Sequence, residues 1–443
     1  MKRGISIILM FVLGFTFLQA QNDNRELQYF RTPGFEGLNV FETPKSTDVE
    51  FDGLKLRVGG DFALQFQGLD HTNASGAPEL IPLGSNVNLP TANLNLDAQL
   101  HKGVRMHLRV FLSSRHHNET WVKGGHIQVD RLDFIEEGFA SGLMDVLTLR
   151  AGVDQPNYGD AMFRRSDNAT AIYNPFVGNY IMDAYTVEPF LEATVHMNDF
   201  FVVGGVTNGL FNPTVNNAAT GWGSDKYQGE IDDLKLTYYG KLGYDKQVDE
   251  DLRVRLTGSV YSAQGADNGN HLYSGDRAGA RYYDVLGFIA PSDSAVTTNF
   301  RSGRFNPGFS KETAIQINPF IKYRGLEFFG VIENTTGNNA RGDREDGSYT
   351  QLGAELLYRF GSWNQLYLGA RYNSVTGYSD YAPGTDKPAD KSINRLNIGG
   401  GYFMTKNTLV KLEYVSQNYD ENFTGHLQDA NFSGVVMEAV ISF

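Results

Sequence analysis

Residues 54–67 alternate between two kinds of side chain, and this period of two restricts the fold more than any other feature of the chain. Successive side chains of a β-strand point to opposite faces, so the segment is predicted to be a strand with one apolar and one polar face. The apolar face consists of Leu54, Leu56, Val58, Gly60, Phe62, Leu64 and Phe66. The pattern recurs at 104–113, 252–261 and 351–360, and the apolar faces of these four segments carry no charge.

About 16 strands are predicted when the whole chain is read in this way, an even number as in single-chain bacterial barrels. They are 54–67, 91–100, 104–114, 123–135, 143–154, 185–197, 200–208, 231–244, 251–263, 312–323, 326–335, 349–360, 364–377, 393–404, 408–419 and 431–443. Every second connection is short, and the others, apart from the moderate 115–122, are long and rich in Gly, Asn, Asp and Ser. We therefore predict an all-β fold: a transmembrane antiparallel β-barrel over 53–443, with short periplasmic turns and long extracellular loops.

Two features leave the strand count open. Pro189 and Pro319 lie inside predicted strands, and each requires a bulge or a strand end because proline cannot donate to a strand ladder. The long connection 264–311 has room for a further hairpin around Arg281–Ala290, which would change the number of strands.

The N-terminus predicts export. Lys2 and Arg3 precede an apolar run over 5–18, and the small residue Ala20 follows it, which is the pattern of a signal peptide over 1–20. The run is shorter than the ~20 residues of a spanning helix, which disfavours the alternative of an uncleaved anchor. Residues 21–52 precede the first strand, so we expect them in the periplasm. A trimer contact, a partial plug and a simply extended chain are three open roles for this segment.

Composition excludes several classes of protein. The chain has 38 Lys and Arg against 51 Asp and Glu, a net charge of −13, which argues against a nucleic-acid binder. It has no cysteine, so disulfides, thiol nucleophiles and Cys-ligated metals are excluded. The adjacent pair His116 and His117 has no third ligand at a recognisable spacing, and no nucleophile elbow or phosphate loop is present. We expect no enzymatic activity, no metal and no cofactor.

The inward face of the predicted strands carries charges of both signs. The arginines Arg57, Arg105, Arg109, Arg253 and Arg255 lie on strands with few inward acids. A guanidinium group matches phosphate and carboxylate in geometry, and rings of Arg or Lys favour anions in a pore. Two interpretations stay equally open: these arginines select anions, or they pair with inward carboxylates and stiffen a hydrated wall.

The C-terminal segment alternates up to the final residue, Phe443. A last strand that ends in an aromatic residue resembles the signal that outer-membrane proteins present to the barrel-assembly machinery. Nearly the whole mature chain resembles a trimeric bacterial porin. The resemblance rests on the strand count, on the alternation of short and long connections, on a lumen that leans toward basic residues and on this C-terminal residue. The chain is similar to the phosphate-selective porin O and P family and to dicarboxylate-type porins, although its frequent lumenal acids depart from that pattern.

This resemblance implies a homotrimer in the lipid and lipopolysaccharide of a Gram-negative outer membrane. It also implies that the third long loop, 155–184, folds into the barrel and sets a constriction. There Arg164 and Arg165 would face Asp160, Asp167 or wall residues; the alternative is a surface loop with solvated charges.

The expected function is a porin that lets small hydrophilic solutes diffuse passively and favours anions such as phosphate or carboxylates. The alternative is a structural or adhesive barrel that binds a partner through its long loops. The sequence leaves the solute and the oligomeric state open.

Overall fold

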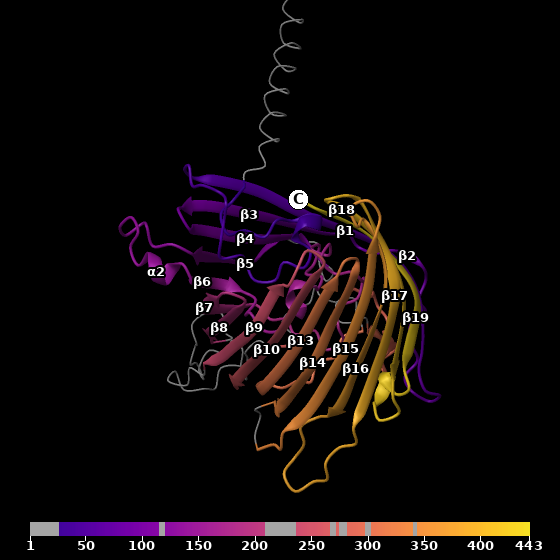
Figure 1. Ribbon diagram of the computed structural model, residues 1–443. Coiled ribbons are helices and arrows are strands. Elements are labelled where there is room, and N and C mark those ends of the chain that lie inside the picture. Colours follow the sequence, from indigo (N-terminus) through magenta and orange to yellow (C-terminus); the bar gives the residue numbers. More distant parts are fainter. Residues whose placement is uncertain are drawn as a thin grey trace, which may run out of the picture.

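The chain folds into a closed antiparallel β-barrel (Figure 1). The computed structural model describes residues 26–114, 120–208, 236–265, 272–273, 281–296, 303–339 and 343–443. The predicted signal peptide 1–20 and the pair His116–His117 lie outside these ranges. In the ranges that are described, no helix combines the length and the apolar character needed to cross a membrane.

Sixteen strands form the wall within the described ranges, as predicted. They are β1 (Lys55–Thr72), β3 (Thr91–His101), β4 (Val104–Ser113), β5 (Trp121–Val129), β6 (Leu147–Asp154), β7 (Glu188–Met197), β8 (Phe200–Thr207), β9 (Thr237–Gln247), β10 (Leu252–Gln264), β13 (Lys311–Tyr323), β14 (Leu326–Asn338), β15 (Gly347–Phe360), β16 (Leu366–Tyr378), β17 (Lys391–Thr405), β18 (Thr408–Tyr419) and β19 (Asn431–Ser442). Neighbours in this series pair antiparallel, and the pairing of β1 with β19 closes the barrel.

Several short elements lie outside the regular wall. β2 (Asn86–Val87) pairs with β1, and β11 (Phe288–Ile289) pairs with β12 (Ala295–Val296) in a separate hairpin. A hairpin therefore exists within 264–311, but it does not add to the wall. The helical turns are η1 (Gly34–Gly37), α2 (Ser141–Met144), η2 (Ala161–Phe163) and η3 (Gly425–Leu427). The predicted strand 123–135 is too long, since β5 ends at Val129 and a turn with α2 follows.

The two prolines are accommodated in different ways. Pro189 is the second residue of β7, which is the strand end that the sequence requires. Pro319 lies inside β13, where the ladder to β14 lacks the rungs at 318 and 319. There the side-chain amide of Asn318 donates to the carbonyl of Gly330 at 3.0 Å, so a side chain bonds to β14 where the ladder is interrupted.

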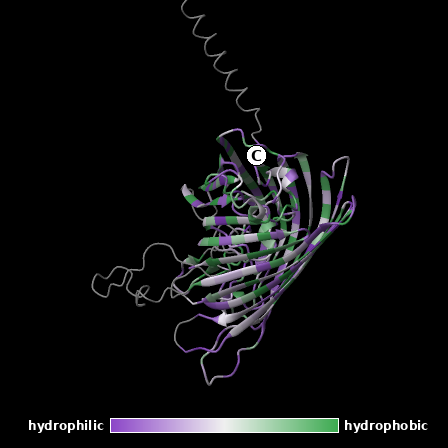
Figure 2. Ribbon diagram, turned by 60° about the vertical axis from the view of Figure 1, so that its left-hand side comes forward, coloured by the Kyte–Doolittle hydropathy of each residue, from purple (hydrophilic) through white to green (hydrophobic). Residues whose placement is uncertain are grey.

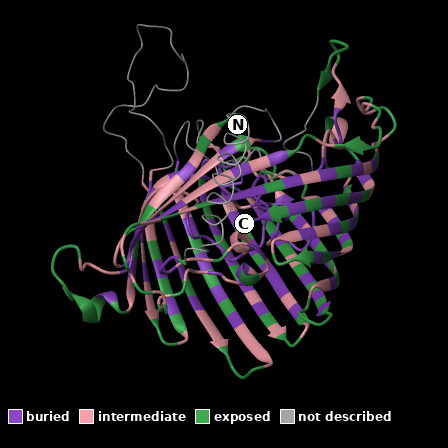
Figure 3. Ribbon diagram, turned by 90° about the horizontal axis from the view of Figure 1, so that it is seen from above, coloured by how far each residue is buried: buried purple, intermediate pink, exposed green. Residues whose placement is uncertain are grey.

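The two faces of the wall differ as the period of two predicts. Figure 2 shows apolar residues along the strands, and Figure 3 shows exposed and buried residues alternating on them. On β15 and β16, Leu352 and Leu368 point outward and are 52% and 63% exposed, whereas their inward neighbours Gln351 and Tyr367 are buried. An apolar exterior suits hydrocarbon, and a closed barrel with this exterior is the architecture of a Gram-negative outer-membrane protein.

Three segments enter the lumen: 26–52, 155–187 and, within 281–309, buried residues such as Arg281, Tyr282 and Phe309. The third long loop enters the barrel as predicted, because Ile172, Phe176 and Val177 are each at most 1% exposed. Ile172 and Phe176 belong to one apolar cluster with the inward residues Leu357 and Leu409, and Val177 belongs to another.

Candidate functional site

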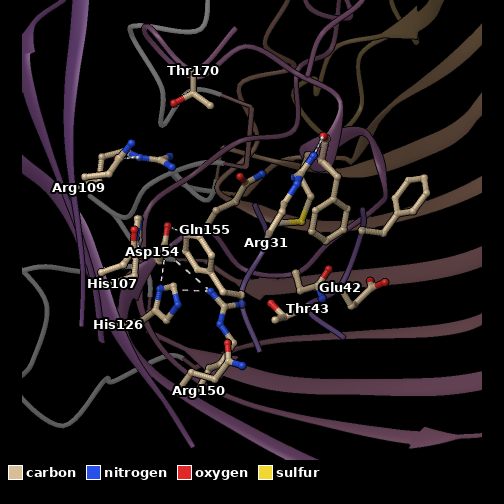
Figure 4. A pocket seen from close by; sticks show the side chains of 18 of the residues that line it. Arg31, Glu42, Thr43, His107, Arg109, His126, Arg150, Asp154, Gln155 and Thr170 are labelled. Carbon is tan, nitrogen blue, oxygen red and sulfur yellow. Dashed lines mark hydrogen bonds and ion pairs between the residues drawn. The ribbon is translucent and has the colours of Figure 1, made fainter. Parts of the chain in front are cut away.

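A cavity of about 270 Å³ lies between the inward faces of β1 and β3–β7 and the segments 26–52 and 155–187 (Figure 4). Its charged lining consists of six arginines, six carboxylates and three histidines. These are Arg31, Arg57, Arg105, Arg109, Arg150 and Arg165; Glu42, Asp61, Asp97, Asp154, Asp167 and Glu192; and His107, His126 and His196. They come from separate strands and loops. Those on strands occupy alternate positions whose side chains point into the barrel, so the closed wall brings them together.

Two of the predicted wall arginines that border the cavity pair with carboxylates. Arg57 of β1 lies 3.5 Å from Asp97 of β3. Arg109 of β4 lies 2.7 Å from Asp167 of loop 155–187 and donates to the side chain of Asn95 at 3.1 Å. Arg109 therefore joins the wall to the loop at the edge of the cavity.

Arg105 and Arg31 have neutral partners. Arg105 donates to the carbonyl of Tyr29 at 2.9 Å and to the side chain of Gln128 at 2.7 Å. Arg31 donates to the carbonyl of Gly37 at 2.9 and 3.1 Å, and its guanidinium lies 3.7 Å from the centroid of the Tyr173 ring. Within the described residues, neither arginine forms an ion pair. These two guanidinium groups therefore bring positive charge to the cavity without a carboxylate in direct contact with them.

Burial lowers the pKa of Arg31 from its ordinary value, and the neighbouring Arg164 and Arg109 lower it further against the effect of Tyr173. An arginine starts from a pKa above 12, so Arg31 stays charged at neutral pH. The ring of Phe30 lies 5.2 Å from the guanidinium of Arg57 and 5.7 Å from that of Arg105. Cations stacked on an aromatic ring are held in a fixed orientation while their edges stay available to donate.

Three of the predicted site residues lie elsewhere in the lumen. Arg164 contacts Glu355 at 2.5 Å, Arg253 contacts Asp245 at 2.7 Å, and Arg255 contacts Asp160 at 2.8 Å. None of the three borders the cavity. For Arg253 and Arg255 the structure shows the pairing with carboxylates that the second of the two interpretations describes.

Arg165 borders the cavity but also pairs with Asp183 of the same loop at 2.6 and 2.8 Å. The expected partners of Arg164 and Arg165 were Asp160, Asp167 or the wall. Arg164 does face wall residues, whereas Arg165 contacts a later residue of its own loop. Bidentate pairing of this kind fixes the loop within the lumen.

Two of the six cavity arginines are absent from the predicted site residues. Arg150 of β6 has the inward parity and pairs with Glu192 at 3.0 Å, so its place on the strand was a usable signal. Arg31 lies in the segment before the first strand, where no periodic pattern indicates a direction. Only the three-dimensional course of 26–52 places it in the lumen.

Two histidines complete the wall opposite segment 26–52 (Figure 4). His107 lies 2.8 Å from Asp97, His126 lies 2.7 Å from Asp154, and the two rings are 5.5 Å apart. No group of three or more His, Asp or Glu side chains in the described ranges is arranged to hold a metal ion. The cavity thus offers cationic hydrogen-bond donors and anionic acceptors in fixed positions.

Comparison with known proteins gives structural matches. No protein-family model matches the chain, and no curated protein matches it. The outer membrane channel DcaP of Acinetobacter baumannii has 12% identity over 88% of this chain and 98% of its own, with a TM-score of 0.50. An anion-selective porin from Comamonas acidovorans has 11% identity over 88% and 100%, with a TM-score of 0.48. OmpT of Vibrio cholerae has 10% identity over 89% and 99%, with a TM-score of 0.49. The similarity to DcaP supports the fold alone.

Proposed function

We propose that the protein is a diffusion channel of the outer membrane, not an enzyme, and that small hydrophilic solutes pass through the lumenal cavity with a preference for anions. The observation that carries this proposal is the pair Arg31 and Arg105, two guanidinium groups that border the cavity on neutral partners. Cationic side chains around a narrow passage favour anions. The shared fold with an outer membrane channel supports the same reading.

Most charges within the described part of the lumen cancel in pairs, so the preference for anions depends on the arginines that form no ion pair there. Glu42 lies among three cations and two further carboxylates that contact one another. This neutral cluster consists of Lys241, Arg253 and Arg255 with Glu42, Asp160 and Asp245. With Glu42 assigned to this cluster and Arg165 paired with Asp183, five arginines face five carboxylate side chains around the cavity, and two of these arginines, Arg31 and Arg105, have neutral partners. The net charge of −13 counts less there, because distant loop charges are screened within a Debye length of ~8 Å at physiological salt.

A second function has one observation in its favour. The three lumenal segments leave a cavity of about 270 Å³, which is small for a wide diffusion pore. A barrel that binds a partner through its long loops has no need of an open lumen. Single-channel conductance of the purified protein separates a channel from a purely adhesive barrel.

We further propose that the barrel is a homotrimer and that the face formed by β5–β8 is its contact surface. β6 and β8 have 8 residues each, whereas a spanning strand needs about 9–11 residues. The same face is hollowed where the small residues Ala151, Ala193 and Gly204 meet. A second copy would cover this short wall, and lipid and lipopolysaccharide would cover the longer strands.

Reversal potential across a salt gradient in a planar bilayer tests the anion preference. We expect the wild-type channel to favour anions and Arg105→Gln to shift it toward cations. Arg131→Gln is the matched control, because Arg131 pairs with Asp145 at 2.6 Å near a short turn and does not border the cavity. A cation-selective wild-type channel would end the anion proposal and leave the diffusion channel standing.

A further inference from the structure

Segment 26–52 is fixed to the barrel wall at both of its ends. At its start, the backbone N–H of Gln28 donates to the side chain of Gln99 at 3.0 Å, and the side chain of Gln28 accepts from the N–H of Gly103 at 2.9 Å. Near its end, Lys45 donates to the carbonyl of Leu147 at 2.6 Å and lies 3.3 Å from Asp130. The contact at Gly103 is in the short turn between β3 and β4.

The middle of the segment is held by packing and by backbone contacts. The Phe35 ring meets the rings of Trp363 and Phe403 at centroid distances of 5.1 and 5.0 Å. Its N–H donates to the carbonyl of Lys406 at 2.7 Å. Gly34, with φ of +76°, lies so close that a Cβ there would be 2.5 Å from that same carbonyl oxygen. Glycine is therefore required at this position for the segment to reach the turn at Lys406.

The deeper part of the segment is bonded to the opposite wall. Asn39 donates from its side chain to Glu327 at 3.0 Å and accepts at its carbonyl from Arg253, also at 3.0 Å. Glu42 lies 2.7 Å from Arg255 and 3.2 Å from Lys241. The contacts thus run along the whole segment, as expected of a folded element and not of a chain that rests loosely in the barrel.

The same segment supplies one side of the cavity. Phe30, Arg31, Phe41, Glu42 and Thr43 all line it. In Figure 4, Arg31, Glu42 and Thr43 stand on one side of the space, with Arg109, His107, His126 and Arg150 on the other. Without the segment the cavity would have no such boundary.

Arg31 is held in place from two directions. Its guanidinium donates to Gly37 within the segment and, at 3.1 Å, to the carbonyl of Phe163 in loop 155–187, while the Tyr173 ring lies against its face. All of these partners are uncharged. The side chain is therefore fixed in orientation and keeps its full attraction for an anion.

We propose that segment 26–52 is a permanent part of the constriction and that Arg31 is a specificity-determining residue of the channel. This inference rests on the proposed function and deepens it: the charge that selects the solute comes in part from a segment that precedes the barrel. Solutes pass beside the segment while it stays bound.

Arg31→Gln tests the role of the side chain, and Glu36→Gln is its matched control. Glu36 lies in the same segment and contacts Lys406 at 2.5 Å, but it is exposed at the rim and does not line the cavity. The expected result is a shift of the reversal potential toward cations, with the anion-to-cation permeability ratio falling roughly two- to fivefold for the loss of one charge. Glu36→Gln should leave the ratio unchanged. An unchanged ratio in Arg31→Gln would overturn the role of Arg31.

A reversible cross-link tests whether the segment stays in place. The chain has no cysteine, so the double variant Glu36→Cys and Lys406→Cys carries the only two thiols. The expected result is equal conductance in the oxidised and the reduced protein. Closure upon oxidation would show that the segment must leave for solutes to pass, which would overturn the inference while the channel itself stands.

Deletion of 26–52 separates the failure of this inference from the failure of the proposed function. Heat-modifiable migration on gels first establishes that each protein is a folded barrel. If the deletion variant conducts and the wild type does not, the segment is a plug and the inference is overturned alone. If neither folded protein conducts, the proposed channel and the inference fall together.

Discussion

Gly60 and Phe443 exchange two backbone hydrogen bonds, each 3.0 Å long, at the seam where the first and last strands of the barrel meet. The pairing of β1 with β19 runs from Thr72 and Asn431 to Asp61 and Ser442, so these two bonds extend the ladder by one rung. The last residue of the chain therefore takes part in closing the barrel.

Deletion of Phe443 should lower the amount of assembled barrel in the outer membrane, because it removes this rung and the terminal aromatic side chain. Phe443→Tyr keeps the backbone bonds and an aromatic ring, and should assemble normally. Heat-modifiability on gels of isolated outer membranes measures both. Wild-type levels of the deletion variant would show that the terminal residue is dispensable for assembly.

Leu352→Arg should destabilise the folded barrel by about 2–4 kcal/mol if this outward position of β15 lies near the middle of the hydrocarbon. Tyr358→Arg lies on the same face of the same strand but close to a short turn, where the cost should be about 0–1 kcal/mol. Urea titration of the protein folded into lipid vesicles gives the free energy of unfolding of each variant. Equal losses would mean that the membrane sits differently on the barrel.

Asp97→Asn should make the channel more anion-selective. Asp97 is the partner of both Arg57 and His107, so its loss releases positive charge into the cavity. Reversal potential should shift toward the anion by roughly two- to fivefold in permeability ratio. Asp199→Asn, which removes an exposed carboxylate at a short turn paired with Lys246, is the control that should leave selectivity unchanged.

Asp160→Asn should loosen loop 155–187 within the barrel. The carboxylate lies 2.8 Å from Arg255 and 3.0 Å from Lys241 and accepts from Thr257 at 2.9 Å. Removing one partner of a buried cluster costs roughly 3–5 kcal/mol. We expect a lower free energy of unfolding and noisier single-channel current, whereas Asp386→Asn, at an exposed loop position, should change neither.

The effect of Asp160→Asn should also depend on pH in a defined direction. Burial alone would raise the pKa of Asp160, but Arg255 and Lys241 hold it well below its usual range. A carboxyl group with a depressed folded pKa contributes stability above its unfolded pKa and loses it as pH falls toward the folded value. The stability difference between wild type and Asp160→Asn should thus be constant above about pH 5 and shrink below about pH 4. A difference that grows on acidification would contradict this assignment.

The strands could be predicted because a lipid-facing wall leaves a direct record in the sequence. Each strand alternates apolar and polar residues, and the observed bounds differ little from the predicted ones. The prediction fails at 123–135, where apolar residues such as Phe134 and Ile135 belong to a turn and are exposed. A short apolar stretch outside a strand has the same appearance as the end of a strand.

The contents of the lumen could be predicted only in part. The period of two placed Arg57, Arg105 and Arg109 on the inward face, where they border the cavity, and the porin resemblance placed the predicted loop 155–184 inside the barrel. Nothing in the sequence shows which acid each arginine meets, because Arg165 with Asp183 and Arg109 with Asp167 depend on how the irregular loop folds. Arg31 could not be found at all, since an irregular segment has no period from which to read a direction.

Along the chain, segment 26–52 continues into a wall strand only at its C-terminal end, through β1, whereas loop 155–187 continues into wall strands at both ends, β6 and β7. The loop must be enclosed while the cylinder forms, but the segment is able to enter afterwards as a tethered peptide. A short tether presents such a peptide to its binding surface in the lumen at an effective concentration roughly in the millimolar range. Docking of the segment is then an intramolecular step, so it does not depend on the concentration of the protein.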